Sequence, residues 1–142
     1  MTRLPLLLAL LAALSLGLFA AACGDDDDNN ATPIQLQQQD RDQIKQMATA
    51  YLAAVQARDT TKALAQLPDG VPQATVKTAM DTWEKEGYQL VSISEDMTVD
   101  GQDVIVTLTL KDKTGKDVTR TMEFRMDKGQ WKLWSPQLKL PA

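Results

Sequence analysis

Residues 97–110, with the sequence MTVDGQDVIVTLTL, contain the turn and the alternation that decide the fold. Asp100-Gly101 separates two segments in which apolar and polar residues alternate. This dipeptide favours a two-residue turn between antiparallel strands, and it places Met97 opposite Val104. In the same register we expect Glu95 to face Val106, Ile93 to face Leu108 and Val91 to face Leu110. The segment therefore predicts a β-hairpin with one apolar face.

Two later turns extend this hairpin into a meander. The segment Asp112–Lys116 contains Gly115, which suits a positive φ, and Lys128-Gly129 is a third turn signal. The second turn pairs Leu110 with Val118, Leu108 with Arg120, Val106 with Met122 and Val104 with Phe124. The third turn pairs Met126 with Trp131, Phe124 with Leu133, Met122 with Ser135 and Arg120 with Gln137. All three turns place the same residues on one face, as a specified register should.

The segment before the meander has a helical pattern. Apolar residues recur at helical spacing over residues 41–57, after an N-cap at Asp40. Thr60 or Thr61 caps a short second helix, and a third helix is expected over residues 72–87, with proline in its first turn and glycine at its end. Because the helices must cover the apolar face, we expect an α+β domain with N-terminal helices packed on a curved four-stranded antiparallel sheet.

This arrangement resembles the nuclear-transport-factor-2-like (cystatin-like) superfamily, in which helices wrap a curved sheet to form a cone. The resemblance covers most of residues 40–140. It rests on YLAAVQARD at residues 51–59, on the meander, and on GQWKL at residues 129–133. Small bacterial lipoproteins of unknown function in this superfamily are similar to this chain. The resemblance implies the fold and says little about activity.

Four polar residues fall on the otherwise apolar face of the predicted sheet: Glu95, Arg120, Ser135 and Gln137. An isolated buried charge is very costly, so Glu95 and Arg120, if covered, must pair or meet a ligand. We hypothesise a pocket lined by Leu108, Met122 and Phe124, in which Arg120 anchors an anionic ligand. The alternative is that these polar residues lie where the helices stop covering the sheet and face water.

The opposite, solvent-compatible face of the sheet carries Ile105 and Trp134. Aromatic residues are enriched at the cores of interfaces, so these two residues mark a candidate surface for a protein partner. Alternatively, the C-terminal residues 138–141 fold over Trp134. The sequence leaves both interpretations open.

The composition disfavours an enzyme. The chain has no histidine, the usual general base near neutral pH, and no phosphate-binding loop, serine elbow or dinucleotide fingerprint. We predict no catalytic residue, no metal site and no cofactor, since the acidic residues of the domain are scattered. Superfamily members that resemble ketosteroid isomerases or dehydratases place Asp, His or Tyr inside the cone. The alternative function is therefore an isomerase or dehydratase that uses a carboxylate such as Glu95 as base.

The N-terminal stretch is typical of a bacterial lipoprotein export signal. It combines Arg3, the apolar segment Leu4–Ala22 and the sole cysteine, Cys23. The segment resembles a lipobox in which Ala20 replaces the commonest leucine. The thiol of Cys23 can carry a thioether-linked diacylglycerol, with acyl chains such as palmitate, and cleavage before Cys23 leaves this residue as the new N-terminus. Two acyl chains give stable membrane anchoring. Nineteen apolar or small residues are also just long enough to span a bilayer, so an uncleaved anchor and an ordinary cleaved signal stay open as alternatives.

The charge distribution divides the rest of the chain. The full sequence carries 19 acidic and 15 basic residues, and without Arg3 and Asp25–Asp28 the counts are 15 and 14. We expect a disordered acidic tether over residues 23–39, after a signal peptide over residues 1–22. One nearly neutral domain over residues 40–142 follows, without a basic patch for nucleic acid.

We therefore predict a lipid-anchored protein on the extracytoplasmic face of the cell membrane. Its domain is expected to be a non-catalytic module that binds a small ligand or a protein of the cell envelope. Neither the identity of the ligand nor the oligomeric state follows from the sequence.

Overall fold

The first helix is the longest of the domain. The computed structural model describes residues 34–141, and α1 spans Gln38–Gln56. The backbone N–H of Gln37 donates to Oδ2 of Asp40 over 2.9 Å, which is half of a capping box at the start of the helix. The helix therefore begins earlier than expected, and Asp40 occupies its first turn rather than the N-cap position.

The ordered domain also begins before residue 40. Ile34 and Leu36 are half-buried and pack against the core. The boundary expected between residues 39 and 40 is thus moved towards the N-terminus, because these two apolar residues belong to the domain. The expected signal peptide, the lipidation of Cys23 and the start of the tether lie outside the described residues. Within residues 34–141, no helix combines the length and apolarity that crossing a membrane requires.

Two shorter helices follow α1. Helix α2 spans Thr60–Leu64 and is capped by the side chain of Asp59. Helix α3 spans Gln73–Glu86. It starts directly after Pro72 and ends at Gly87, which has the left-handed conformation that glycine adopts at little cost. The predicted ends of this helix are confirmed.

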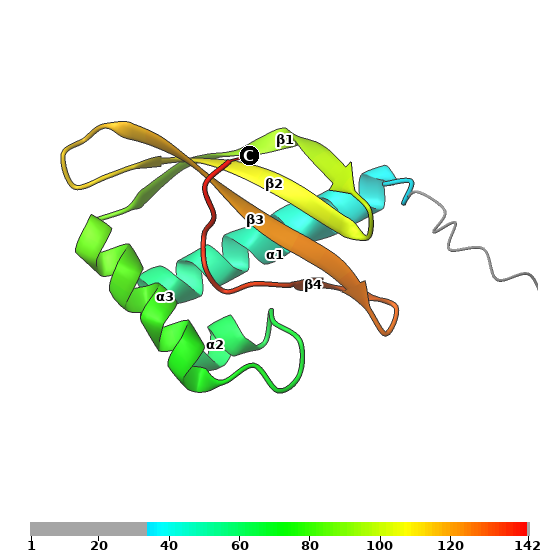
Figure 1. Ribbon diagram of the computed structural model, residues 1–142, viewed down its shortest axis with the longest axis horizontal. Helices are drawn as coiled ribbons and strands as arrows, with labels where there is room; N and C mark the ends of the chain where they lie inside the picture. The colour runs from blue at the N-terminus through cyan, green and yellow to red at the C-terminus, as the bar shows by residue number, and fades with distance from the viewer. Residues whose placement is uncertain (1–33, 142) are drawn as a thin grey trace, which may run out of the picture.

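A four-stranded antiparallel sheet completes the domain (Figure 1). Its strands are consecutive in space, in the order β1 (Gln89–Asp100), β2 (Asp103–Lys111), β3 (Asp117–Asp127) and β4 (Gln130–Leu133). The sheet is strongly twisted, α1 runs along it, and α2 and α3 lie beside one end of α1 (Figure 1). This architecture confirms the predicted α+β class.

The register of β2, β3 and β4 agrees with the sequence analysis. Between β2 and β3, Val104 pairs with Phe124, Val106 with Met122, Leu108 with Arg120 and Leu110 with Val118. Between β3 and β4, Phe124 pairs with Leu133 and Met126 with Trp131. The two later turns were therefore placed correctly.

The first hairpin turns one residue later than its Asp-Gly dipeptide suggests. Asp100 pairs with Asp103, so Gly101 and Gln102 form the loop. Gly101 has a φ of +59°, which glycine tolerates at the first loop position. As a consequence, Met97 pairs with Val106, and its predicted pairing with Val104 is wrong.

A bulge in β1 brings the strand back to the expected register. Between Met97 and Ile93, three residues of β1 lie opposite one residue of β2. Ile93 thereby regains its predicted partner, Leu108. Glu95 lies in the bulge, with 80% of its side chain exposed, so its predicted place opposite Val106 is wrong.

Two residues predicted for the apolar face are exposed instead. Val91 lies at a second register shift, between Leu90 and Ser92, and 51% of its surface is exposed. Met126, which is 43% exposed, lies next to the turn between β3 and β4. Both stand at the margins of the apolar face.

The chain leaves the sheet after Leu133 and returns only at Lys139, which forms an isolated bridge with Thr121. Between these two points lie five residues of the C-terminal tail, 134–138, whereas only Met122 and Glu123 lie between their partners on β3. The predicted pairing of Ser135 and Gln137 with β3 is therefore wrong, because the tail bulges out where a regular strand would have continued. Figure 1 shows this segment in red beyond β4.

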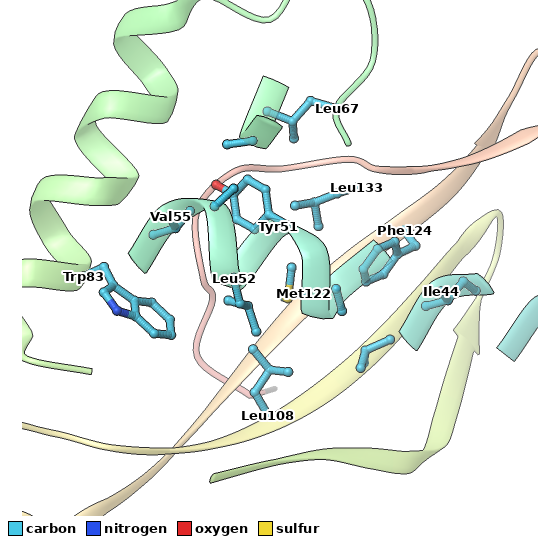
Figure 2. Close-up of a cluster of buried hydrophobic side chains, with 14 of the residues drawn as sticks. Ile44, Tyr51, Leu52, Val55, Leu67, Trp83, Leu108, Met122, Phe124 and Leu133 are labelled. Carbon is cyan, nitrogen blue, oxygen red and sulfur yellow. The ribbon is translucent and has the colours of Figure 1, made fainter. Parts of the chain in front are cut away.

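The core lies between α1 and the inner face of the sheet (Figure 2). Burial of this apolar surface is the main force that holds the two layers together. The largest fully buried side chains include Ile44, Tyr51, Leu67, Met80, Leu108, Met122, Phe124 and Leu133.

Candidate ligand-binding site

A cavity of about 340 Å³ opens between α1, α3, the sheet and the C-terminal tail. This volume lies within the range of small-molecule pockets. The helices contribute Tyr51, Leu52 and Val55 from α1, and Thr78, Ala79, Thr82 and Trp83 from α3. The remaining lining residues are Tyr88, Arg120, Pro136, Gln137 and Leu138.

Arg120 is the only charged residue in this lining. It lies on β3 opposite Leu108, on the face that carries the core. Its Nη2 donates to the hydroxyl of Tyr88 over 2.7 Å, and its Nη1 donates to the carbonyl of Thr119 over 2.8 Å. The guanidinium carbon lies 5.4 Å from the centre of the Tyr88 ring, within cation–π range. These contacts hold the guanidinium at the cavity.

Among residues 34–141, no carboxylate forms an ion pair with Arg120. Two of the other three arginines in residues 34–141 are paired: Arg125 with Asp103, and Arg58 with two acidic residues of α3. Arg120 is half-buried and keeps N–H donors beyond the two in use. Surroundings of low dielectric constant strengthen the attraction between such a charge and an anion.

Tyr88 is positioned by the end of α3. Gly87, with a φ of +65°, turns the chain so that Tyr88 packs against Trp83. The two rings meet edge to face, with centroids 5.6 Å apart and planes at 76°. The Tyr88 hydroxyl accepts from Arg120, which leaves its own proton available for a further acceptor.

The C-terminal tail forms one wall of the cavity. The hydroxyl of Tyr51 donates to the carbonyl of Pro136 over 2.5 Å, and both residues are buried. Burial raises the pKa of Tyr51 well above its usual value, so its hydroxyl stays a neutral donor. Gln137 and Leu138 follow directly and line the cavity.

The threonines of α3 present oxygen lone pairs rather than free protons. Thr78 donates to the carbonyl of Ala74 over 3.0 Å, and Thr82 donates to the carbonyl of Thr78 over 2.9 Å. Because these protons are used inside the helix, the threonines add no donors to those of Arg120, Tyr88, Trp83 and Gln137 in the lining.

The cavity contains only part of the predicted site. Arg120 lines it, together with Gln137. Met122 and Phe124 do not, because they are buried in the core with 1% and 0% of their surface exposed. Ser135 is half-buried outside the lining, where its Oγ accepts from a backbone N–H of the tail over 3.4 Å.

Glu95 lies away from the cavity. The bulge of β1 carries it to the surface, where it forms an ion pair with Lys45 of α1. The expectation that Glu95 and Arg120 share one site is therefore wrong. Its physical reason is the bulge, which removes Glu95 from the row of residues that it would have joined in a regular strand.

The contribution of α3 to the cavity was not predicted. No pattern in the sequence links Trp83 or Tyr88 to Arg120. The position of Tyr88 directly after the helix-ending Gly87 was a local signal that it lies where helix and sheet meet. Its contact with Arg120 depends on how α3 docks on the sheet, and no local pattern encodes that docking.

The outer face of the sheet carries Ile105 and Trp134, as expected. They lie on either side of Glu123, which pairs with Ile105 and whose carbonyl accepts from the Trp134 backbone N–H over 2.8 Å. Trp134 is 40% exposed. The guanidinium carbon of Arg125 lies 4.2 Å from the centre of its ring, and Arg125 also pairs with Asp103 over 2.7 Å. A role of this face in partner binding stays a prediction.

Known structures share the fold of this chain. A protein of unknown function with a cystatin-like fold from Nostoc punctiforme superposes with a TM-score of 0.51 at 11% identity, over 77% of this chain and 96% of that protein. A nuclear-transport-factor-2-like protein of unknown function from Pseudomonas putida superposes with a TM-score of 0.53 at 14% identity, over 75% of this chain and 90% of that protein. No family model matches the sequence, and no curated protein matches it either.

At this level of identity the similarity shows the fold alone. The chain has the nuclear-transport-factor-2-like, or cystatin-like, α+β fold, which confirms the fold expected from the sequence. Because this fold hosts unrelated functions, the function has to be argued from the cavity.

Proposed function

We propose that this chain is a lipid-anchored protein of the cell envelope whose domain binds a small ligand in the cavity beside Arg120 and Tyr88. In this proposal Cys23 carries the lipid at the extracytoplasmic face of the cell membrane. The domain binds its ligand without catalysing a reaction. The observation that carries the binding role is the half-buried guanidinium of Arg120, which lines a cavity with polar and apolar walls and has no acidic partner among the described residues.

The chemistry of the lining favours binding over catalysis. Its ionisable side chains are Arg120, Tyr51 and Tyr88. Arginine stays protonated in proteins, and the raised pKa of Tyr51 makes its hydroxyl a poorer acid, whereas a general base works best with a pKa near the ambient pH. Glu95, on which the isomerase or dehydratase alternative depends, lies outside the cavity and is paired with Lys45. These observations support a binding site.

A protein partner on the outer face of the sheet is the second candidate. The exposed Trp134 under the guanidinium of Arg125 favours it, since tryptophan and arginine are enriched at interface hot spots. A stable complex with another envelope protein that is lost on Trp134→Ala would support this candidate.

The cavity is tested by native mass spectrometry of the protein expressed from its full-length gene in its own host. Extra mass that disappears on denaturation would identify a bound small molecule. Thr82→Phe places a bulky ring at the edge of the cavity, on an exposed residue of α3, so we expect the extra mass to be lost. Ala79→Phe fills the cavity from the neighbouring helix position and repeats the test.

The matched control is Ala74→Phe, on the same helix and outside the lining. This variant should keep the bound mass. A wild-type protein that carries no extra mass and binds none of the metabolites extracted from its host would contradict the ligand-binding function.

A further inference from the structure

We infer that the ligand of this cavity is an organic carboxylate with a compact apolar body, held by Arg120 and Tyr88. The inference rests on the proposed function, because it names the chemical class of ligand for the same cavity. It is carried by the adjacent donors of Arg120 and Tyr88, by the apolar part of the lining and by the volume.

The donors lie side by side. The Nη2 atom of Arg120 and the hydroxyl of Tyr88 are 2.7 Å apart, and the geometry has the arginine donating to the tyrosine. Arg120 uses one N–H on Tyr88 and another on the Thr119 carbonyl, out of the five that a guanidinium provides. A carboxylate offers two adjacent acceptor oxygens, so one can meet a remaining N–H of Arg120 and the other the O–H of Tyr88.

Apolar side chains form part of the lining, beside the polar side chains of Thr78, Thr82 and Gln137. Leu52 and Val55 from α1, Ala79 and Trp83 from α3, and Leu138 from the tail line the cavity. The volume of about 340 Å³ lies at the lower end of the range of small-molecule pockets, which favours a compact ligand. A short aliphatic acid or an aromatic acid with one ring is such a ligand.

Other ligand classes fit less well. A cationic ligand would meet the uncompensated charge of Arg120. Inorganic phosphate is strongly hydrated, and the single cationic side chain of the lining, with a few neutral polar groups, would have to replace that water. A neutral apolar molecule would leave the donors of Arg120 and Tyr88 without a partner, which costs affinity.

The test compares carboxylates with their neutral amides. Benzoate with benzamide, and octanoate with octanamide, are titrated by isothermal calorimetry into the protein expressed from its full-length gene. At least one carboxylate should bind about tenfold or more tightly than its amide, because a charged hydrogen bond is lost in the amide. Arg120→Gln should abolish this preference.

Two further variants locate the effect. Arg41→Gln also removes one positive charge, but near the start of α1, away from the end that lines the cavity. In this control variant the preference for the carboxylate should stay unchanged. Tyr88→Phe removes the second donor and should weaken carboxylate binding between about twofold and tenfold, with no such effect on the amide. If Arg120→Gln does not fold, Arg120→Lys keeps the charge without the planar fork and should retain the preference with weaker binding.

The outcomes separate the inference from the proposed function. Equal binding of acid and amide, unchanged in Arg120→Gln, would overturn the inference and leave a cavity for apolar ligands. Binding of neither acid nor amide would also overturn it, whereas the ligand-binding function would then fail only if the native protein carried no small molecule and bound no extracted metabolite.

Discussion

The hydroxyl of Tyr51 on α1 donates to the backbone carbonyl of Pro136, 85 residues further along the chain, over 2.5 Å. This hydrogen bond ties the C-terminal tail to the first helix, between two residues that line the cavity. The tail is also attached to β3 by the bridge between Thr121 and Lys139. The wall formed by the tail is thus fixed at both sides.

Tyr51→Phe should destabilise the protein by about 1–3 kcal/mol, because the buried carbonyl of Pro136 loses its partner. The free energy of unfolding from urea titrations measures the effect. Tyr88→Phe also removes one hydroxyl, but its partner Arg120 is half-buried and has further N–H donors, so its cost should be smaller. Equal stability of Tyr51→Phe and wild type would show that the hydrogen bond does not hold the tail.

Gly87→Ala should destabilise the protein more than Gly70→Ala. Both glycines have positive φ angles, +65° and +85°, but a Cβ at position 87 would lie 2.8 Å from Cβ of Lys113, whereas nothing lies within 4 Å of one at position 70. The left-handed conformation costs an alanine about 1–2 kcal/mol at either site, and the clash adds to this only at Gly87. Urea unfolding of the two variants checks the order, which a larger loss in Gly70→Ala would contradict.

Asp40 should make the stability of the domain depend on pH in the acid range. Its Oδ1 accepts from the indole N–H of Trp131 over 3.0 Å, and its Oδ2 accepts from the backbone N–H of Gln37. The hydrogen bond from Trp131, followed by that from Gln37, lowers the pKa of Asp40. Since the folded-state pKa lies below the unfolded one, this contribution is fully present above the unfolded value of about 3.9 and is lost as the pH falls through the folded-state pKa.

Asp40→Asn should therefore reduce the free energy of unfolding near pH 7 and reduce it less at about pH 3. Asp100→Asn, at an exposed position of the first hairpin, is the control. If both variants changed stability by equal amounts at both pH values, the ionised form of Asp40 would have no special role.

Cys23→Ser should release the protein from membranes. The thiol is the attachment point for the lipid in the proposed function, and a serine cannot carry a thioether-linked lipid. Fractionation of cells that express the variant and the wild type measures the effect. A variant that stays fully in the membrane fraction would contradict lipid anchoring and favour an uncleaved apolar anchor.

Glycine turns made much of the sheet predictable. Gly115 and Gly129 both have a φ of +79°, and the turns that contain them set the register of β2, β3 and β4. This register by itself predicts that Arg120 lies on the apolar face of the sheet, which the helices cover. The bulge at Glu95 was not predictable, because a turn shifted by one residue and a compensating bulge leave the apolar pattern of β1 nearly unchanged.

In the candidate site, the position of Arg120 could be predicted from the sequence, whereas its neighbours could not. Arg120 stood out as a cation in an apolar row, a property that alternation along the strand reveals. The positions of Tyr88 and Trp83 could not be predicted, since these residues reach the cavity through the docking of α3 on the sheet. The wall at Pro136 could not be predicted either. The C-terminal tail departs from the sheet after Leu133, where the sequence pattern predicts a continuing strand.

The length of α1 sets the position of the cavity relative to the point where the chain joins the domain. From Gln38 to Val55, at 1.5 Å per residue, the helix covers about 25 Å, and only its far end lines the cavity. In the proposed lipid-anchored protein, the tether would enter the domain at one end of α1, and the ligand would bind at the other end of the same helix.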